Sequence, residues 1–160
     1  MLNAVENAND RQKQVLFNKV VRHYNGDLQS KTFALLGLTF KPKTDDMREA
    51  PSRVILEALI NAGGSVRAFD PEAMDEAMRI YGDKPGLTLV ETAEEALQGA
   101  NALIVVTEWK NFWSPDFDLI KNTLKDAVIF DGRNLYQPEL LNKQGITYYG
   151  IGRGLKNITA

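Results

Sequence analysis

The sequence contains no cysteine and a single histidine, His23, among its 160 residues. Without cysteine, the chain has no disulfide, no thiolate metal ligand and no cysteine nucleophile of its own. One histidine also argues against a histidine-rich metal centre and against a Ser-His-Asp catalytic arrangement. We expect His23, near the end of a predicted helix, to be exposed and chemically inert.

Long apolar runs and an excess of one charge are missing as well. No stretch approaches the roughly 20 apolar residues of a membrane span, and the first residues do not resemble a signal peptide. The 19 basic and 21 acidic residues give a formal net charge of -2, whereas nucleic-acid binders usually have a clear basic excess. The composition therefore predicts a cytoplasmic protein that binds neither nucleic acid nor membranes.

The chain does contain a regular alternation of short apolar strands and amphipathic helices. After a helix at residues 1–24, we predict strands at residues 32–37, 66–69, 87–90, 102–106, 127–130 and 146–149. Between them we predict helices at residues 52–62, 72–81, 93–97, 117–124 and 138–143. Such alternation across short loops is typical of a parallel sheet with helices on both faces. The predicted fold class is α/β, a Rossmann-like doubly wound parallel sheet of about six strands, preceded by an N-terminal helix.

The glycine fingerprint of dinucleotide-binding sheets is also lacking. A Gly-x-Gly-x-x-Gly run should connect the first strand to its helix, but this position contains only Gly37. The one Gly-x-Gly run, at residues 150–154, follows the last strand and leads into no helix, so we interpret it as a flexible tail. Anion binding by this sheet must therefore come from side chains.

In open α/β sheets, ligands lie outside the carboxyl ends of the strands. Lys41 follows a strand end directly, where a fixed ammonium group can meet a phosphate or an oxyanion. Arg133 has the corresponding position after another strand, and its guanidinium suits bidentate recognition of phosphate or carboxylate. Lys43 and Arg48 are further candidates in the first loop. The alternative is that these cations are solvated and paired with neighbouring acidic residues.

Two acidic residues in that loop, Asp45 and Asp46, raise the possibility of a divalent cation site. Neighbouring cations would neutralise such a site, so we predict no metal. We expect instead that Asp46 or Glu49 orients Arg48 or caps the helix that begins near Pro51.

Residues 108–113, Glu-Trp-Lys-Asn-Phe-Trp, follow the most apolar of the predicted strands. Their aromatic rings either cover a bound nucleobase or substrate, or close over the hydrophobic core. The second interpretation is the more common one for aromatic side chains next to a buried strand.

The motifs at four strand ends resemble one known family. Residues 37–52 read Gly-Leu-Thr-Phe-Lys-Pro-Lys-Thr-Asp-Asp-Met-Arg-Glu-Ala-Pro-Ser and are similar to the hallmark of the C-terminal domain of UDP-glucose 6-dehydrogenases. Phe-Asp-Pro at 69–71, Thr-Glu-Trp at 107–109 and Asp-Gly-Arg-Asn at 131–134 recur there in the same order. Residues 9–13, Asn-Asp-Arg-Gln-Lys, resemble the end of the helix that joins the two domains of that family.

The resemblance implies a part in oxidising UDP-glucose to UDP-glucuronate by two NAD-dependent hydride transfers. In the family, an N-terminal domain holds NAD and the catalytic cysteine, and the connecting helix forms much of a homodimer core. Residues 1–25 would then be the tail of this interdomain and dimerisation helix, and residues 26–160 the UDP-sugar-binding domain. We expect the chain to be the C-terminal part of such an enzyme and to be inactive without its N-terminal domain.

Carried over by motif, Phe40, Lys41 and Arg133 would bind the UDP-sugar, and Arg48 would reach NAD held mainly by the other domain. No catalytic residue is expected within this chain. The same domain of a UDP-N-acetylmannosamine or GDP-mannose dehydrogenase is the main alternative, although residues 44–51 are more similar to the UDP-glucose group. A non-catalytic nucleotide-binding module and a Mg²⁺-dependent receiver-type domain are two further alternatives.

Overall fold

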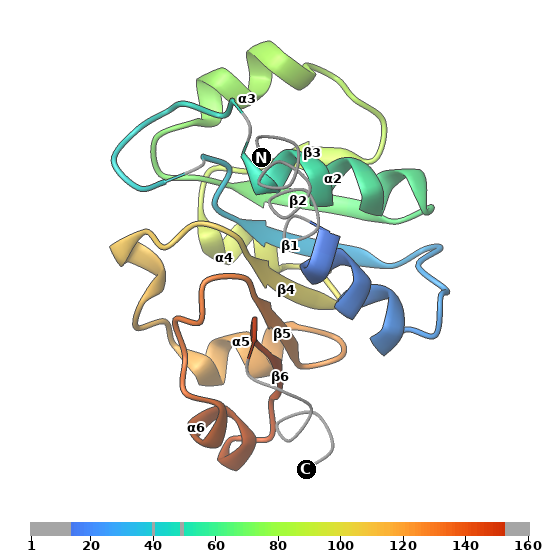
Figure 1. Ribbon diagram of the computed structural model, residues 1–160, viewed down its shortest axis with the longest axis vertical. Helices are drawn as coiled ribbons and strands as arrows, with labels where there is room; N and C mark the ends of the chain where they lie inside the picture. The colour runs from blue at the N-terminus through green and yellow to red at the C-terminus, as the bar shows by residue number, and fades with distance from the viewer. Residues whose placement is uncertain (1–13, 40, 49, 153–160) are drawn as a thin grey trace, which may run out of the picture.

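The computed structural model describes residues 14–39, 41–48 and 50–152. Six parallel strands form one sheet in the order β3-β2-β1-β4-β5-β6, stacked from top to bottom in Figure 1. The strands are β1 (Thr32–Leu36), β2 (Ser65–Phe69), β3 (Leu87–Leu89), β4 (Ala102–Val105), β5 (Val128–Asp131) and β6 (Thr147–Tyr149). This is the doubly wound order of dinucleotide-binding sheets. The predicted α/β, Rossmann-like fold is confirmed.

The helices between the strands also begin and end within two residues of their predicted positions. They are α2 (Pro51–Asn61), α3 (Met74–Tyr81), α4 (Ala93–Leu97), α5 (Phe117–Thr123) and α6 (Pro138–Lys143). A 3-10 turn, η1 (Lys110–Phe112), was not predicted. Helix α3 begins two residues later than predicted, because Asp70 accepts hydrogen bonds from the backbone N–H groups of Glu72 and Ala73. Within the described ranges, no helix is long and apolar enough to cross a membrane.

Helices cover both faces of the sheet, and the alternation of strand side chains divides the core accordingly. One core cluster joins Phe33 and Leu35 of β1 to Ile55 of α2. The other joins Leu36 of β1 to Leu97 of α4, and it also includes residues of α5 and α6. Right-handed crossovers on either side of β1 and β4 place the two helix groups on opposite faces.

The N-terminal helix, described over residues 14–23, belongs to the first of these two cores. Leu16 is 5% exposed and Val20 is fully buried, in one cluster with Phe130 and Tyr149. This helix therefore lies on the same face of the sheet as α2 and contacts the part of the core that contains Phe130 of β5 and Tyr149 of β6. The division of the chain at residue 25 stays a prediction, and residues 1–13 of the predicted helix lie outside the described part.

His23 is partly buried on the inner side of this helix, so the prediction that it is exposed was wrong. That it is chemically inert stays a prediction. Its Nδ1 atom lies 2.7 Å from the hydroxyl oxygen of Tyr149, and its ring packs edge-on against Phe130. Burial lowers the pKa of His23, although the charge of Asp126 acts in the opposite direction. The inward orientation follows from helical periodicity, because positions 16, 20 and 23 share one face.

Candidate functional site

Asp70, directly after β2, has a fully buried carboxylate that joins neighbouring strand ends. Its Oδ2 atom accepts hydrogen bonds from the backbone N–H groups of Leu38 at 2.7 Å and Thr39 at 3.3 Å. The same oxygen accepts from the indole N–H of Trp109 at 3.1 Å. Buried carboxylates are stable only when such donors compensate their charge. Asp70 thus fixes where the loop after β1 begins.

The loop after β1 also contacts the loop after β4. The hydroxyl of Thr107 donates to the backbone oxygen of Thr39 at 2.6 Å. The hydroxyl of Thr39 in turn donates to the backbone oxygen of Lys41 at 2.7 Å. Gly37 has a φ of +97°, and a Cβ atom there would lie 2.6 Å from the Cβ and N atoms of Thr107. The backbone of Lys41 is therefore anchored at the end of β1, while its side chain is exposed.

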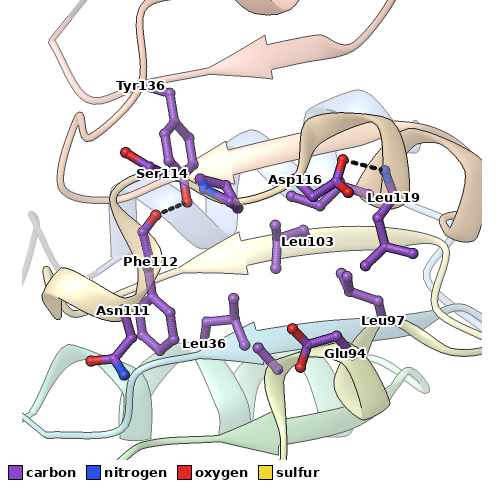
Figure 2. A pocket seen from close by; sticks show the side chains of 13 residues that line it. Leu36, Glu94, Leu97, Leu103, Asn111, Phe112, Ser114, Asp116, Leu119 and Tyr136 are labelled. Carbon is purple, nitrogen blue, oxygen red and sulfur yellow. Dashed lines mark hydrogen bonds between the residues drawn. The ribbon is translucent and has the colours of Figure 1, made fainter.

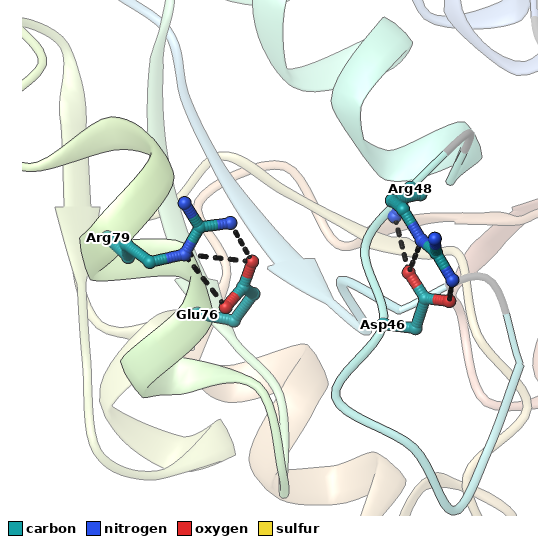
Figure 3. Close-up of polar contacts among 4 residues, drawn as sticks. All are labelled: Asp46, Arg48, Glu76 and Arg79. Carbon is teal, nitrogen blue, oxygen red and sulfur yellow. Dashed lines mark hydrogen bonds and ion pairs between the residues drawn. The ribbon is translucent and has the colours of Figure 1, made fainter.

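Further along this loop, Arg48 and Asp46 form a bidentate ion pair (Figure 3). The Nε–Oδ1 and Nη2–Oδ2 distances are 3.0 and 2.8 Å, and Oδ1 also accepts from the backbone N–H of Arg48 at 2.9 Å. These bonds lower the pKa of Asp46 to about 2, and the charge of Lys41 acts in the same direction. The expectation that Asp46 orients Arg48 is confirmed.

The other alternative, a helix cap from Asp46, is not what the structure shows. The N-cap residue of α2 is Ala50, which makes no side-chain capping bond, and Pro51 occupies the first turn. The hydroxyl of Ser52 instead donates to the backbone oxygen of Leu38 at 2.6 Å. Glu49 lies outside the described residues.

A second exposed ion pair lies on α3, across from the first one (Figure 3). Arg79 donates to Glu76, with an Nε–Oε2 distance of 3.1 Å, and this bond lowers the pKa of Glu76. The negative charge of Asp46 acts in the opposite direction on the pKa of Glu76, so the two carboxylates interact electrostatically. Sequence reasoning missed this pair, although its i, i+3 spacing is the signal that could have revealed it.

Asp131, the last residue of β5, has the same organising role on the other side of β4. Its Oδ1 atom accepts from the backbone N–H of Arg133 at 3.0 Å. Its Oδ2 atom accepts from the backbone N–H of Leu135 at 2.7 Å and from the hydroxyl of Tyr148 at 2.8 Å. The turn that carries Arg133 is therefore fixed by a buried carboxylate.

Arg133 reaches back over the end of β4. Its Nε–H donates to the backbone oxygen of Val106 at 3.0 Å. The same nitrogen lies 3.1 Å from a carboxylate oxygen of Glu108. The structure thus places Lys41 and Arg133 at strand ends on either side of β4, where the adjacent residues Thr107 and Glu108 contact the two loops.

Three of the four predicted binding residues are described, and all three lie at the carboxyl edge of the sheet. They are Lys41 and Arg48 after β1 and Arg133 after β5. Phe40 lies outside the described residues, as does the tail from residue 153. Across the described residues, no group of three or more His, Cys, Asp or Glu side chains is arranged to hold a metal ion.

The aromatic residues after β4 divide into two groups. Trp109 and Phe112 are 7% and 3% exposed, so for them the core interpretation is confirmed. Trp113 is 51% exposed, and its indole N–H donates to the backbone oxygen of Glu108 at 3.1 Å. The half-exposed Trp113 therefore braces the loop that presents Glu108.

A pocket of about 230 Å³ lies between α4 and α5 (Figure 2). Sequence reasoning did not find it, because its walls come from helices that are distant in sequence. Leu36 and Leu103 form part of its apolar floor, and the acidic residues Glu94 and Asp116 line it. The Asp116 carboxylate caps α5 by accepting from the backbone N–H of Leu119 at 3.1 Å. Two negative charges disfavour a phosphate, so the cationic strand ends remain the better anion site.

The strand order defines a Rossmann-like domain. It has no glycine fingerprint after β1, and cationic side chains follow β1 and β5. The chain belongs to the UDP-glucose/GDP-mannose dehydrogenase family, whose UDP binding domain matches residues 34–138. The family prediction from the four motifs is confirmed.

Individual relatives support this assignment over nearly the whole chain. UDP-glucose 6-dehydrogenase of Pseudomonas aeruginosa is 46% identical over 156 residues, which cover 96% of this chain and 34% of that protein. The enzyme of the same name from Rhizobium meliloti is 40% identical over 145 residues, covering 91% and 32%. The structure of a UDP-glucose dehydrogenase from Pyrobaculum islandicum superposes with a TM-score of 0.77 at 27% identity, covering 95% and 32%. The chain thus spans about a third of the length of the curated relatives it matches.

Proposed function

We propose that the chain is the nucleotide-sugar-binding domain of an NAD-dependent UDP-glucose 6-dehydrogenase. The observation that carries the proposal is the 46% identity to a UDP-glucose 6-dehydrogenase over 96% of the chain. The geometry of the strand ends agrees with it, because Lys41 and Arg133 lie on either side of β4. An ammonium and a guanidinium at these positions suit the two phosphoryl groups of a nucleoside diphosphate.

In this proposal, Lys41 and Arg133 bind the diphosphate of UDP-glucose, and Phe40 contacts the same ligand. Asp131 and the Thr39–Thr107 contacts hold the two cations in place before the ligand arrives. Such preorganisation lowers the entropic cost of binding.

Arg48 is the residue of this chain that would contact NAD, which accepts the hydride when bound. Its side chain is 87% exposed and oriented by Asp46, which fits a contact to a phosphate presented by another domain. The single glycine at Gly37 approaches Thr107 and leaves no open turn for a pyrophosphate. The chain's residues therefore fit one cofactor contact, with the main NAD site in a separate N-terminal domain.

The proposal predicts that the chain alone does not oxidise UDP-glucose, because it contains no cysteine nucleophile. Purified chain, NAD and UDP-glucose should give no increase in NADH absorbance. NADH formation under these conditions would contradict the assignment of catalysis to another domain. Homodimerisation through the N-terminal helix is part of the same proposal, and size-exclusion chromatography of the complete enzyme tests it.

Binding of the nucleotide is tested by calorimetric titration of the chain with UDP, UDP-glucose and GDP-mannose. We expect UDP and UDP-glucose to bind more tightly than GDP-mannose. Lys41→Ala and Arg133→Ala should each weaken UDP binding while circular dichroism stays unchanged. Lys143→Ala, a charge change at the opposite edge of the sheet, is the matched control. Tighter binding of GDP-mannose would instead favour the GDP-mannose branch of the family.

A further inference from the structure

Arg133 is already paired with an internal anion in the structure. The carboxylate of Glu108 lies 3.1 Å from its Nε atom, and the two side chains are 32% and 36% exposed. Both groups thus remain accessible to solvent while they neutralise each other. A ligand phosphate that approaches this guanidinium meets the carboxylate at the same time.

The pair is built from two sides that are held independently. The loop of Glu108 is braced by the Trp113 indole, which donates to its backbone oxygen, and by Thr107, whose hydroxyl bonds to Thr39. Arg133 is held by Asp131 through its backbone N–H. Because neither residue depends on the other for its backbone position, the carboxylate stays near the guanidinium when a ligand is present.

We propose that Glu108 is a built-in competitor for the anion at Arg133, which weakens nucleotide binding and keeps it reversible. The inference rests on the proposed function of Arg133 and adds a role for a residue outside the predicted binding set. A phosphate that binds Arg133 must either displace the Glu108 carboxylate or bind next to it, where the two negative charges repel each other. Partly exposed ion pairs are weak, so this competition lowers affinity without abolishing it. A weakened ligand site favours release of the product, a step that limits many enzymes.

Charge removal with conserved shape tests the inference directly. The unmodified chain and its Glu108→Gln variant are titrated with UDP and with inorganic pyrophosphate. We expect Glu108→Gln to bind both about two- to fivefold more tightly, the range that corresponds to an ion pair of this kind. The gain should shrink as ionic strength rises, because salt screens the repulsion.

Two variants separate competition from structural support. Glu108→Asp keeps the negative charge and should bind as weakly as the unmodified chain. Asp83→Asn makes the same change of charge at the opposite edge of the sheet and should leave both affinities unchanged. A damaged loop weakens binding and cannot tighten it, so a gain specific to Glu108→Gln supports competition.

The outcomes also distinguish this inference from the proposed function. Equal or weaker binding by Glu108→Gln, together with loss of binding in Arg133→Ala, overturns the competitor role alone. Pyrophosphate binding without any preference for UDP overturns the nucleotide assignment but leaves the competitor role measurable. Absence of binding of either probe to the unmodified chain overturns both.

Discussion

The indole N–H of Trp109 donates to the Oδ2 atom of Asp70 at 3.1 Å, and this bond joins the ends of β4 and β2 across the intervening strand β1. The same oxygen accepts from the backbone N–H of Leu38 at the end of β1. One buried carboxylate thus holds three adjacent strand ends together. The loop that carries Lys41 and Arg48 begins at this point.

Asp70→Asn should destabilise the chain by about 2–3 kcal/mol, because an amide presents its NH₂ group to donors and leaves them unsatisfied. The carboxylate accepts from four backbone N–H groups and one indole N–H, so no amide orientation satisfies them all. Urea unfolding followed by circular dichroism measures the change. Asp83→Asn is the control and should shift stability by less than about 0.5 kcal/mol. Equal stabilities of the two variants would contradict the role of Asp70.

Gly37→Ala should destabilise the chain more than Gly99→Ala does. Both glycines have positive φ values, +97° and +76°, but only at Gly37 would a Cβ atom approach another group, Thr107 at 2.6 Å. The backbone penalty of about 1–2 kcal/mol is common to both variants. Steric overlap adds about 1–3 kcal/mol at Gly37 alone. Thermal or urea unfolding compares them, and similar losses would show that the contact with Thr107 relaxes freely.

The ion pair of Asp46 and Arg48 predicts a specific pH effect. Hydrogen bonds from Arg48 lower the pKa of Asp46 from 3.8 to about 2. Because the folded-state pKa lies below the unfolded one, the pair stabilises the chain above pH 3.8 and this contribution is lost as pH falls toward 2. Arg48→Ala should return the pKa of Asp46 toward 3.8, as measured by carboxyl-carbon NMR titration.

Arg79→Ala is the matched control for that titration, because Arg79 pairs with Glu76 and not with Asp46 (Figure 3). It should raise the pKa of Glu76 and leave Asp46 low. A shift of Asp46 in Arg79→Ala as large as that in Arg48→Ala would refute the separate pairing.

His23 makes stability depend on pH near neutrality. Burial lowers its folded-state pKa below 6.5, so the unfolded chain binds the proton more readily. The free energy of unfolding should therefore fall as pH decreases through 6.5, until the folded form is itself protonated. Urea unfolding at about pH 7.5 and about pH 5.5 measures this loss.

His23→Gln removes the titrating ring and should reduce the loss of stability between these two pH values. His23 is the only histidine in the chain, so its ring protons also give an unambiguous NMR titration. An ordinary pKa in that titration would show that packing against Tyr149 and Phe130 does not hinder protonation.

The sequence predicted most of the fold because apolar periodicity reflects backbone geometry over a few residues. It failed at His23, where a polar residue was assumed to face solvent although positions 16, 20 and 23 share a face. It also placed the start of α3 too early, because the local turn in which Asp70 accepts from the backbone N–H groups of Glu72 and Ala73 was not recognised. The pocket between α4 and α5 was missed for a different reason, because its walls come from segments that are distant along the chain.

The pattern of residues along the chain thus determined the strands, the helices and the strand ends that carry Lys41, Arg48 and Arg133. The composition alone determined that the chain has no cysteine nucleophile. Only the tertiary structure decided the partners of these side chains. Asp46 could be paired with Arg48 from proximity in sequence, but Glu108 and Arg133 meet because β4 and β5 are neighbours in register. Such contacts depend on how distant strands align, and short-range periodicity carries no information about that alignment.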